Sequence, residues 1–440
     1  PSKPSPPWKS NNMSISYFWV FILLLTAGTP VVFALLIGPG VSLMLDGNQV
    51  FFSALLTRLY SGMNSFPLMA VPFFILAGEL MNQGGITQSI VRFSQTLIGH
   101  YRGGLAQVNI LSSVLFAGLS GSAVADTSAL GKMLIPAMEE NGYSRRFAAA
   151  VTAASSVIGP IIPPSGIMIL YAFIMNVSVA GMFLAGITPG LLICAGLMIV
   201  TSRIAKKRNY PVANQKATWY ERGSALKTSF LPLLTPVILL GGIVLGVFTP
   251  TEAAAAAAGY ALIITLFVTN TLKFDKLPHI LVNAAVQSGT ILLLVGSAVT
   301  FAWIITVSGM ADTLAEQIVG ITDNVLLLLL IINLFLFAIG MFLDAGPAIL
   351  ILGPVFAPIF ISLGIDPLHF AVIMCVNLTV GLATPPMGLV LFVAASVSGE
   401  KTENIAYEML PFLAVEVLVI FIITYFPAVT MTLPRLFGFA

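Results

Sequence analysis

Charged side chains are scarce in this sequence. Asp, Glu, Lys and Arg make up 8% of the 440 residues, whereas about a quarter would be charged in a soluble protein. Hydrophobic residues reach 58%, and the mean hydropathy is +1.01. These values predict an all-α polytopic membrane protein, because the sequence does not show the alternating ten-residue strands of a membrane barrel. The net charge of +2 is too small to indicate a nucleic-acid partner.

Cysteine and histidine are also rare. Cys194 and Cys375 both lie in apolar segments, and the three histidines are scattered without metal-ligand spacing, so we expect neither a disulfide nor a metal cluster. No A-x-A site follows the first apolar run, and we expect no cleaved signal peptide. Residues 1–12 are polar and rich in Pro and Ser. We expect them to be a linker or a cloning remnant, and Met13 then offers a native start.

Apolar segments long enough to cross a bilayer recur along the chain. A spanning helix needs about 20 apolar residues. Val50–Leu59 is the weakest candidate, because Asp46 and Arg58 shorten it. The expected crossings are Tyr17–Ile37, Phe66–Leu80, Phe147–Met175, Met182–Ile204, Thr228–Phe248, Ala253–Val268, Ile280–Val307, Leu368–Ala394 and Ile405–Val429.

Two further apolar regions, Leu105–Met138 and Asn324–Ser362, carry small residues and a carboxylate near their centres. Each is too long for one crossing, so we expect a helix–break–helix hairpin that enters the membrane and returns.

The charges beside the hairpins predict their orientation, because cytoplasmic loops collect Lys and Arg. Arg102, Arg145 and Arg146 flank the first hairpin, which places both its ends in the cytoplasm. Only acidic residues flank the second hairpin, so we expect it to open outward.

An internal repeat connects these regions. GPIIPPSG (159–166) recurs as GLATPPMG (381–388), and short amphipathic stretches, 86–97 and 310–318, precede the two hairpins. Five crossings separate the hairpins, and five is an odd number, so the second copy is expected to be inverted. Pro-Pro removes backbone donors and breaks a helix. Inverted repeats with broken helices indicate the binding site of a secondary transporter.

Oxygen atoms are expected to converge where the breaks meet the hairpin tips. Hydroxyl and carbonyl oxygens with few full charges suit Na⁺. Ser165 and Met387 each begin a half-helix after Pro-Pro, and the positive end of a helix dipole favours an anion. The candidates are Ser120, Ser122, Asp126, Thr127, Ser128, Ser155, Ser156 and Ser165 with the carbonyls of 159–162, and Asp344, Gly346, Asn377, Thr379 and Thr384 with the carbonyls around Gly381.

Structural interpretations compete with these. A single Ser or Thr in a membrane helix usually bonds its own backbone or a neighbouring helix. An intramembrane carboxylate indicates function, yet Asp126 and Asp344 could each cap a hairpin tip.

Rival functions of the whole protein are also open. Gly118–Gly121 fits the GxSG pattern of an intramembrane serine protease, with His279 or His369 as the base. A stand-alone Na⁺/dicarboxylate carrier and a channel are further alternatives.

Several long stretches resemble the large membrane subunit of the tripartite ATP-independent periplasmic (TRAP) transporters, the DctM type. The resemblance extends from Met13 to the C-terminus. The stretches are SFPLMAVPFFILAGELMNQGGI (65–86), GLSGSAVADTSALG (118–131), GPIIPPSG (159–166), GVFTPTEAAAAAAGYAL (246–262), GMFLDAGPAILILGPVFAPI (340–359) and GLATPPMGLVLFVAASVSG (381–399).

The resemblance implies a transporter of the bacterial inner membrane, surrounded by lipid, and not an enzyme. It implies a small four-helix membrane subunit and a periplasmic binding protein as partners. Uptake of an organic acid anion, sialic acid first and a C4-dicarboxylate second, would be driven by Na⁺. An elevator mechanism is implied, with transport units over 85–204 and 309–440 and scaffold helices over 13–84 and 205–308.

The resemblance also implies the positions of the binding residues. Na⁺ would bind where hairpin tips meet broken helices, and the substrate carboxylate would lie between. The implied Na⁺ residues are Ser120, Ser122, Gly159, Ile161, Gly340, Asp344, Thr379, Gly381 and Thr384. The expected substrate residues are Ser122, Ser165, Asp344, Asn377 and Met387.

Overall fold

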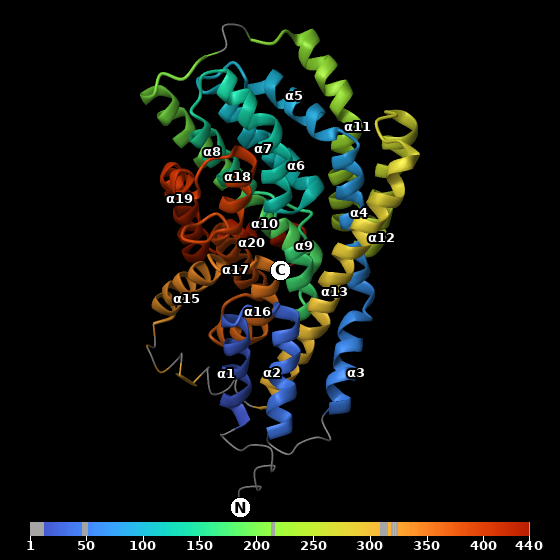
Figure 1. Ribbon diagram of the computed structural model, residues 1–440, viewed down its shortest axis with the longest axis vertical. Helices are drawn as coiled ribbons and strands as arrows, with labels where there is room; N and C mark the ends of the chain where they lie inside the picture. The colour runs from blue at the N-terminus through green and yellow to red at the C-terminus, as the bar shows by residue number, and fades with distance from the viewer. Residues whose placement is uncertain are drawn as a thin grey trace, which may run out of the picture.

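The computed structural model describes residues 13–45, 52–212, 216–308, 316–317, 320, 322 and 324–439. The regular elements of this part of the chain are helices (Figure 1). Seven of them are long and apolar enough to cross a membrane: Phe66–Gln83, Val179–Lys207, Trp219–Val244, Pro250–Val268, Phe274–Val307, Ala345–Ser362 and Thr402–Tyr425. The prediction of an all-α, multi-span membrane protein is therefore confirmed.

The expected first crossing, Tyr17–Ile37, is wrong. The chain forms two antiparallel helices there, α1 (Met13–Thr26) and α2 (Val31–Leu45), which pack on each other (Figure 1). Gly28 adopts a left-handed φ of 80°, and Pro30, directly before α2, has no N–H to continue α1. With 14 and 15 residues, each helix is shorter than a crossing requires.

The candidate crossing Val50–Leu59 is not a separate one either. Helix α3 (Phe52–Met63), the short η2 (Phe66–Met69) and α4 (Ala70–Gln83) follow one another along the long axis of the molecule (Figure 1). Pro67 lies in the first turn of η2, so the ladder of helical hydrogen bonds is interrupted there while the chain continues in the same direction.

One side of the molecule is formed by α4, α11 (Trp219–Val244), α12 (Pro250–Ile263) and α13 (Leu277–Val307). Helix α12 packs closely on α4, because its buried face consists of alanines. Helix α5 (Ile86–Ile98) is amphipathic as predicted and buries Ile86 and Ile90. Its expected counterpart, 310–318, lies largely outside the described residues.

The remaining helices repeat one order: a hairpin, a broken helix, then a long helix. Both hairpins and both breaks appear where the sequence predicts them. The closing helix of the second copy ends at Tyr425, shortly before Pro427, instead of continuing to Val429. The first copy consists of α6 (Gly104–Ser120), α7 (Ala123–Glu140), α8 (Arg145–Ser156), α9 (Gly166–Met175) and α10 (Val179–Lys207). The second consists of α15 (Val325–Gly340), α16 (Ala345–Ser362), α17 (Pro367–Gly381), α18 (Leu389–Ser398), α19 (Thr402–Tyr425) and α20 (Ala428–Leu436).

The two copies interlock. The half-helix α9 of the first copy packs on α16 of the second, and α18 of the second packs on α7 of the first. A β-carbon placed on Gly353 would lie 3.8 Å from Cε2 of Tyr171, and one placed on Gly131 would lie 3.3 Å from Cγ1 of Val397. Each half-helix is therefore buried by the hairpin of the other copy.

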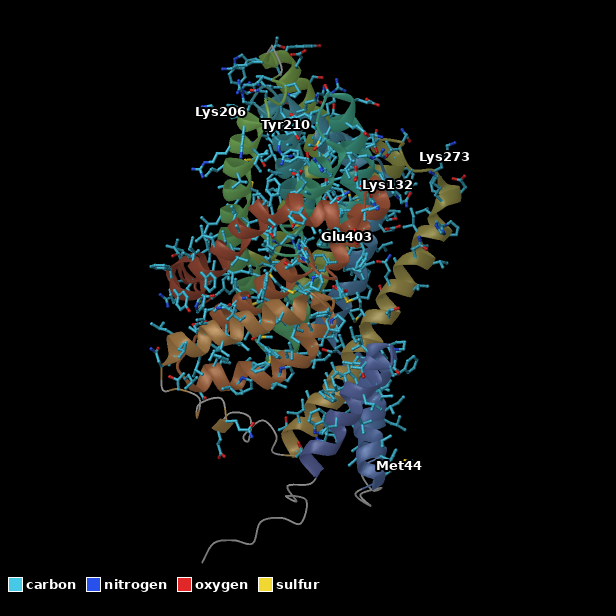
Figure 2. The ribbon with its side chains drawn as sticks, turned by 60° about the vertical axis from the view of Figure 1, so that its left-hand side comes forward. Met44, Lys132, Lys206, Tyr210, Lys273 and Glu403 are labelled. Atoms are coloured by element: carbon cyan, nitrogen blue, oxygen red, sulfur yellow. The ribbon has the colours of Figure 1, made fainter. Side chains whose placement is uncertain are left out.

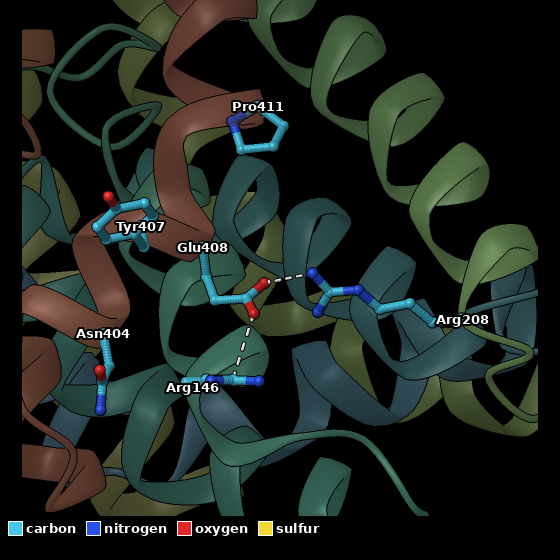
Figure 3. Close-up of a pocket in the computed structure, with 6 residues that line it drawn as sticks. All are labelled: Arg146, Arg208, Asn404, Tyr407, Glu408 and Pro411. Carbon is cyan, nitrogen blue, oxygen red and sulfur yellow. Dashed lines mark ion pairs between the residues drawn. The ribbon is translucent and has the colours of Figure 1, made fainter.

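A charged cluster also joins the copies (Figure 3). The carboxylate of Glu408 on α19 pairs with Nε of Arg146 at 3.3 Å and with Nη2 of Arg208 at 2.7 Å. The Arg208 guanidinium also lies over the ring of Phe147, 5.4 Å from its centroid. Burial acts to lower the pKa of Arg208, but Glu408 and Tyr210 outweigh this effect and raise it. Arg208 is therefore a permanent cation in this cluster.

Candidate functional site

The first break separates α8 from α9. Pro163 and Pro164 lack the N–H groups that would continue the helix, and α9 starts again only at Gly166. Ser165 caps this new helix: its Oγ accepts from the Met168 N–H at 3.3 Å and donates to the Pro160 carbonyl at 2.5 Å. The Ser165 side chain is completely buried. Its hydroxyl hydrogen is therefore used within the break.

The tip of the first hairpin contacts this break. Gly121 takes a φ of +58° between α6 and α7, and Ser122 caps α7 by accepting from the Ala125 N–H at 3.3 Å. A β-carbon on Gly121 would lie 2.8 Å from the carbonyl oxygen of Pro164. Only glycine fits this approach, which sets the N-terminus of α7 beside that of α9.

Asp126 lies at the centre of this contact. It is completely buried, and the Ser120 hydroxyl donates to its Oδ1. Its Oδ2 has no hydrogen-bond partner among the described residues, and a β-carbon on Gly159 would collide with that oxygen. A buried carboxylate oxygen without a partner is costly unless a cation or donor satisfies it. The oxygen set of Ser120, Asp126 and the break therefore fits a monovalent cation.

The second copy repeats the contact between tip and break. Gly340 ends α15 and Gly381 ends α17, and a β-carbon on Gly381 would lie 2.5 Å from Cα of Gly340. The Gly388 N–H, at the start of α18, donates to the carbonyl of Met341 at 3.1 Å. Hairpin tip and broken helix are therefore joined backbone to backbone.

The predicted side chains of this second site have varied roles. Thr379 and Thr384 donate their hydroxyl hydrogens to the carbonyls of Cys375 and Val380, at 2.6 and 2.9 Å, which leaves their oxygens able to accept. Asp344 is exposed and caps α16, accepting from the Ala345 N–H at 2.7 Å. Met387 is 49% exposed.

Asn377 has the contacts of a packing residue. Its amide donates to Oδ1 of Asn333 at 2.6 Å and to the carbonyl of Ile373 at 2.8 Å, and no donor remains for the loop 382–388. The first copy has a matching arrangement, in which Ser155 accepts from Ser113 at 2.9 Å. Such interhelical bonds hold membrane helices together. The Oδ1 of Asn377 is buried without a hydrogen-bond partner among the described residues, and a role of Asn377 in substrate binding stays a prediction.

Two helix N-termini meet at the first break, and a third, that of α16, lies against α9. The start of α7 touches the start of α9 through Gly121, as described above. A β-carbon on Gly346, in the first turn of α16, would lie 4.0 Å from Cδ1 of Leu170, in the second turn of α9. Each N-terminus carries the positive end of a helix dipole, equivalent to about half a charge. The adjoining starts of α7 and α9 therefore favour an anion beside the first break, whereas the start of α16 already carries the carboxylate of Asp344.

The geometry gives no support to a protease. The Ser120 hydroxyl is bonded to Asp126, whereas a serine nucleophile needs an adjacent base that is in most cases histidine. The His369 ring is paired with Thr430 at 2.8 Å, and the His279 ring with Asn283 at 3.3 Å.

Comparison with known proteins identifies the family of the chain. Residues 18–429 match the family described as "Tripartite ATP-independent periplasmic transporter, DctM component". The chain is 41% identical to the sialic acid TRAP transporter large permease protein SiaM of Vibrio cholerae, over 94% of this chain and 96% of that protein. It is 33% identical to the C4-dicarboxylate TRAP transporter large permease protein DctM of Rhodobacter capsulatus, over 96% and 98%.

A solved structure shares the fold. The YdaH transporter of Alcanivorax borkumensis superimposes with a TM-score of 0.65 at 17% identity, over 94% of this chain and 98% of that one. The family match covers nearly the whole chain, and both relatives are covered almost completely. The chain therefore belongs to the DctM family of TRAP transporter large permeases, and it is a transporter, not an enzyme.

Proposed function

We propose that the chain is the large membrane subunit of a Na⁺-driven transporter that imports an organic acid across the bacterial inner membrane. The observation that carries this proposal is the pairing of a hairpin tip with a helix break in each of the two copies. In the first, the orphaned Oδ2 of Asp126 supplies a site for a cation, and the adjoining N-termini of α7 and α9 supply a site for an anion. Cation and acid would then bind as neighbours, so that each stabilises the other.

Coupling follows from this proximity. An acid carried alone would place an uncompensated charge in a low-dielectric site, which is expensive. A bound Na⁺ lowers that cost, and the loaded site can then cross as a nearly neutral unit. Na⁺ is here a transported ion, held by Ser120 and Asp126 with carbonyls of the first break, and by the oxygens around Gly340, Thr379 and Thr384 in the second copy.

The proposed movement is an elevator. In this proposal the second copy is inverted in the membrane relative to the first, and the two interlocked copies travel together past α4, α11, α12 and α13. The word tripartite in the family description supports two further components. We assign these as a small four-helix membrane subunit and a periplasmic binding protein that delivers the acid.

Sialic acid is the first candidate substrate, and a C4-dicarboxylate is the second. The higher identity to a sialic acid permease, 41% against 33% for a dicarboxylate permease, supports this order.

The experiment is uptake of radiolabelled N-acetylneuraminate into proteoliposomes that hold the complete membrane complex. Four arms combine an inward gradient of Na⁺ or K⁺ with the presence or absence of the binding protein. Uptake is expected only with both Na⁺ and the binding protein, and unlabelled N-acetylneuraminate should compete better than succinate. Uptake that persists without Na⁺, or without the binding protein, would overturn the proposal.

A further inference from the structure

A polar pocket lies outside the site described above, between α4 and α5 on one side and α7 on the other. Its volume is about 350 Å³, within the range of pockets that hold small molecules. Nearly all of its polar groups are uncharged amides and hydroxyls, and its one charged residue is a lysine. The lining residues are Asn82, Gln83, Thr87, Ala125, Ser128, Ala129 and Lys132.

This pocket begins where the first hairpin tip ends. Ala125 lines it, and the Ala125 N–H donates to the capping oxygen of Ser122. On the other wall, a β-carbon on Gly78 would lie 2.9 Å from the carbonyl of Leu119, so α4 touches the tip one turn before Asn82. Figure 2 shows Lys132 in the upper half of the molecule, where Lys206 and Lys273 also lie. The pocket thus leads from the tip toward the lysine-rich end of the protein.

The pocket contains an unsatisfied polar atom. Thr87 is 8% exposed, and its Oγ1 has no hydrogen-bond partner among the described residues. A buried hydroxyl without a partner is destabilising, and a ligand oxygen in the pocket would remove that cost. Lys132 is exposed and forms none of the described ion pairs with Asp or Glu. It is free to pair with an anion.

The charge of the pocket limits its ligand. Lys132 supplies one positive charge, and the other polar groups suit the hydroxyl or amide groups of a ligand. Glu79 lies on α4 one turn before Gln83, outside the lining residues. Its carboxylate opposes a second negative charge near that end of the pocket. A polyhydroxylated monocarboxylate fits this pattern, whereas a dicarboxylate would leave one carboxylate without a cation.

We propose that this pocket is a release site, in which a hydroxyl-rich monocarboxylate pairs with Lys132 and Thr87 after it leaves the first hairpin tip on the cytoplasmic side. The inference rests on the proposed function, because it names the class of acid and the route by which it leaves. Asn82 and Gln83 on α4 belong to the proposed scaffold, whereas Thr87 and the lining residues of α7 belong to the proposed transport unit 85–204. The pocket therefore exists only in positions that bring this unit against α4. Release through it is thereby confined to one end of the transport cycle.

The test is protection of an introduced cysteine in the complete reconstituted complex. Ser128→Cys is made in a background without Cys194 and Cys375, both of which are buried. The label is a small anionic thiol reagent, and the probes are N-acetylneuraminate and succinate. N-acetylneuraminate should slow labelling and succinate should not. Lys132→Ala, or Thr87→Val, should raise the protecting concentration of N-acetylneuraminate by about fivefold, since each removes one contact with the ligand.

Controls separate this inference from the proposed function. Ala129→Cys repeats the test at a second lining position, in case Ser128→Cys disturbs the helix. Lys206→Cys, near the same end but outside the pocket, should label without protection. Absence of protection in both lining variants, or equal protection by succinate, would overturn the release site. The Na⁺ and binding-protein arms of the uptake assay, run on the unmodified complex, still decide the proposed function independently.

Discussion

Replacing Gly381 with alanine is expected to separate the second hairpin from its broken helix. The added β-carbon would lie 2.5 Å from both Cα and C of Gly340, whereas ordinary contacts begin at 3.4 Å. Both atoms belong to the backbone, so no side chain can rotate out of the way. One helix must therefore move by about 0.9 Å, the difference between these two distances. The hydrogen bond from Gly388 to Met341 bridges the same joint and would lengthen with it.

Overpacking of this kind costs about 1–3 kcal/mol. A cost of this size lowers the melting temperature of a large domain by roughly 2–6 °C. The second effect is specific to the site. If Na⁺ binds where Thr379 and Thr384 face the tip, it stabilises the folded protein, and NaCl should raise the melting temperature relative to KCl. In Gly381→Ala this Na⁺-dependent increment should shrink, because the oxygens no longer converge.

The measurement is thermal unfolding of the purified complex in matched NaCl and KCl. Gly353→Ala is the control, because a β-carbon there meets its nearest atom, Cε2 of Tyr171, only at 3.8 Å. It should retain both the melting temperature and the Na⁺ increment. If Gly381→Ala behaves like Gly353→Ala, the close contact of the two backbones is not what organises this site.

Three further substitutions test other features. Ser165→Ala should lower the initial rate of Na⁺-driven uptake. Ser178→Ala is the control and should leave that rate unchanged, because it removes the equivalent cap of α10 at a similar cost of about 1 kcal/mol. Equal uptake rates in the two variants would refute a role of Ser165 beyond capping. Glu408→Gln should lower the melting temperature by a few degrees and make it less sensitive to salt, since two ion pairs are lost; Glu139→Gln, whose single pair with Arg145 is half-exposed, should have little effect. Glu416→Met should raise the melting temperature, because both carboxylate oxygens of Glu416 are buried without a hydrogen-bond partner among the described residues; a decrease would mean that a buried donor satisfies them.

Local sequence signals predicted the breaks and the hairpins correctly. Pro163-Pro164 and Pro385-Pro386 cannot continue a helix, and Gly121 with Ser122 has the composition of a tip and a cap. The N-terminal reversal escaped prediction because hydrophobicity is continuous across Gly28 and Pro30. A window that averages apolar residues passes over a tight turn, although a glycine followed two residues later by a proline is itself a turn signal.

The roles of individual side chains could not be read from the sequence. Asp126 and Asp344 are the carboxylates at the two hairpin tips, yet Asp126 lies inside the first turn of α7 and is fully buried with an orphaned oxygen, whereas Asp344 is the exposed cap of α16. Asn377 is one turn from Gly381 but bonds to α15. These differences arise from which helix packs opposite each residue, and that depends on contacts between segments far apart in the chain.

The exchange of half-helices between the two copies has a consequence for biosynthesis. The packing of the first hairpin cannot be completed when its own residues emerge from the ribosome, because α18 is one of the partners of α7. Val397 is made about 270 residues after Gly131, which at 5–20 residues per second is a delay on the order of tens of seconds. During that interval the face of α7 around Gly131 lies in the membrane without Val397 beside it. A chain truncated before α18 should therefore be a substrate for membrane quality-control proteases, even though its first copy is intact.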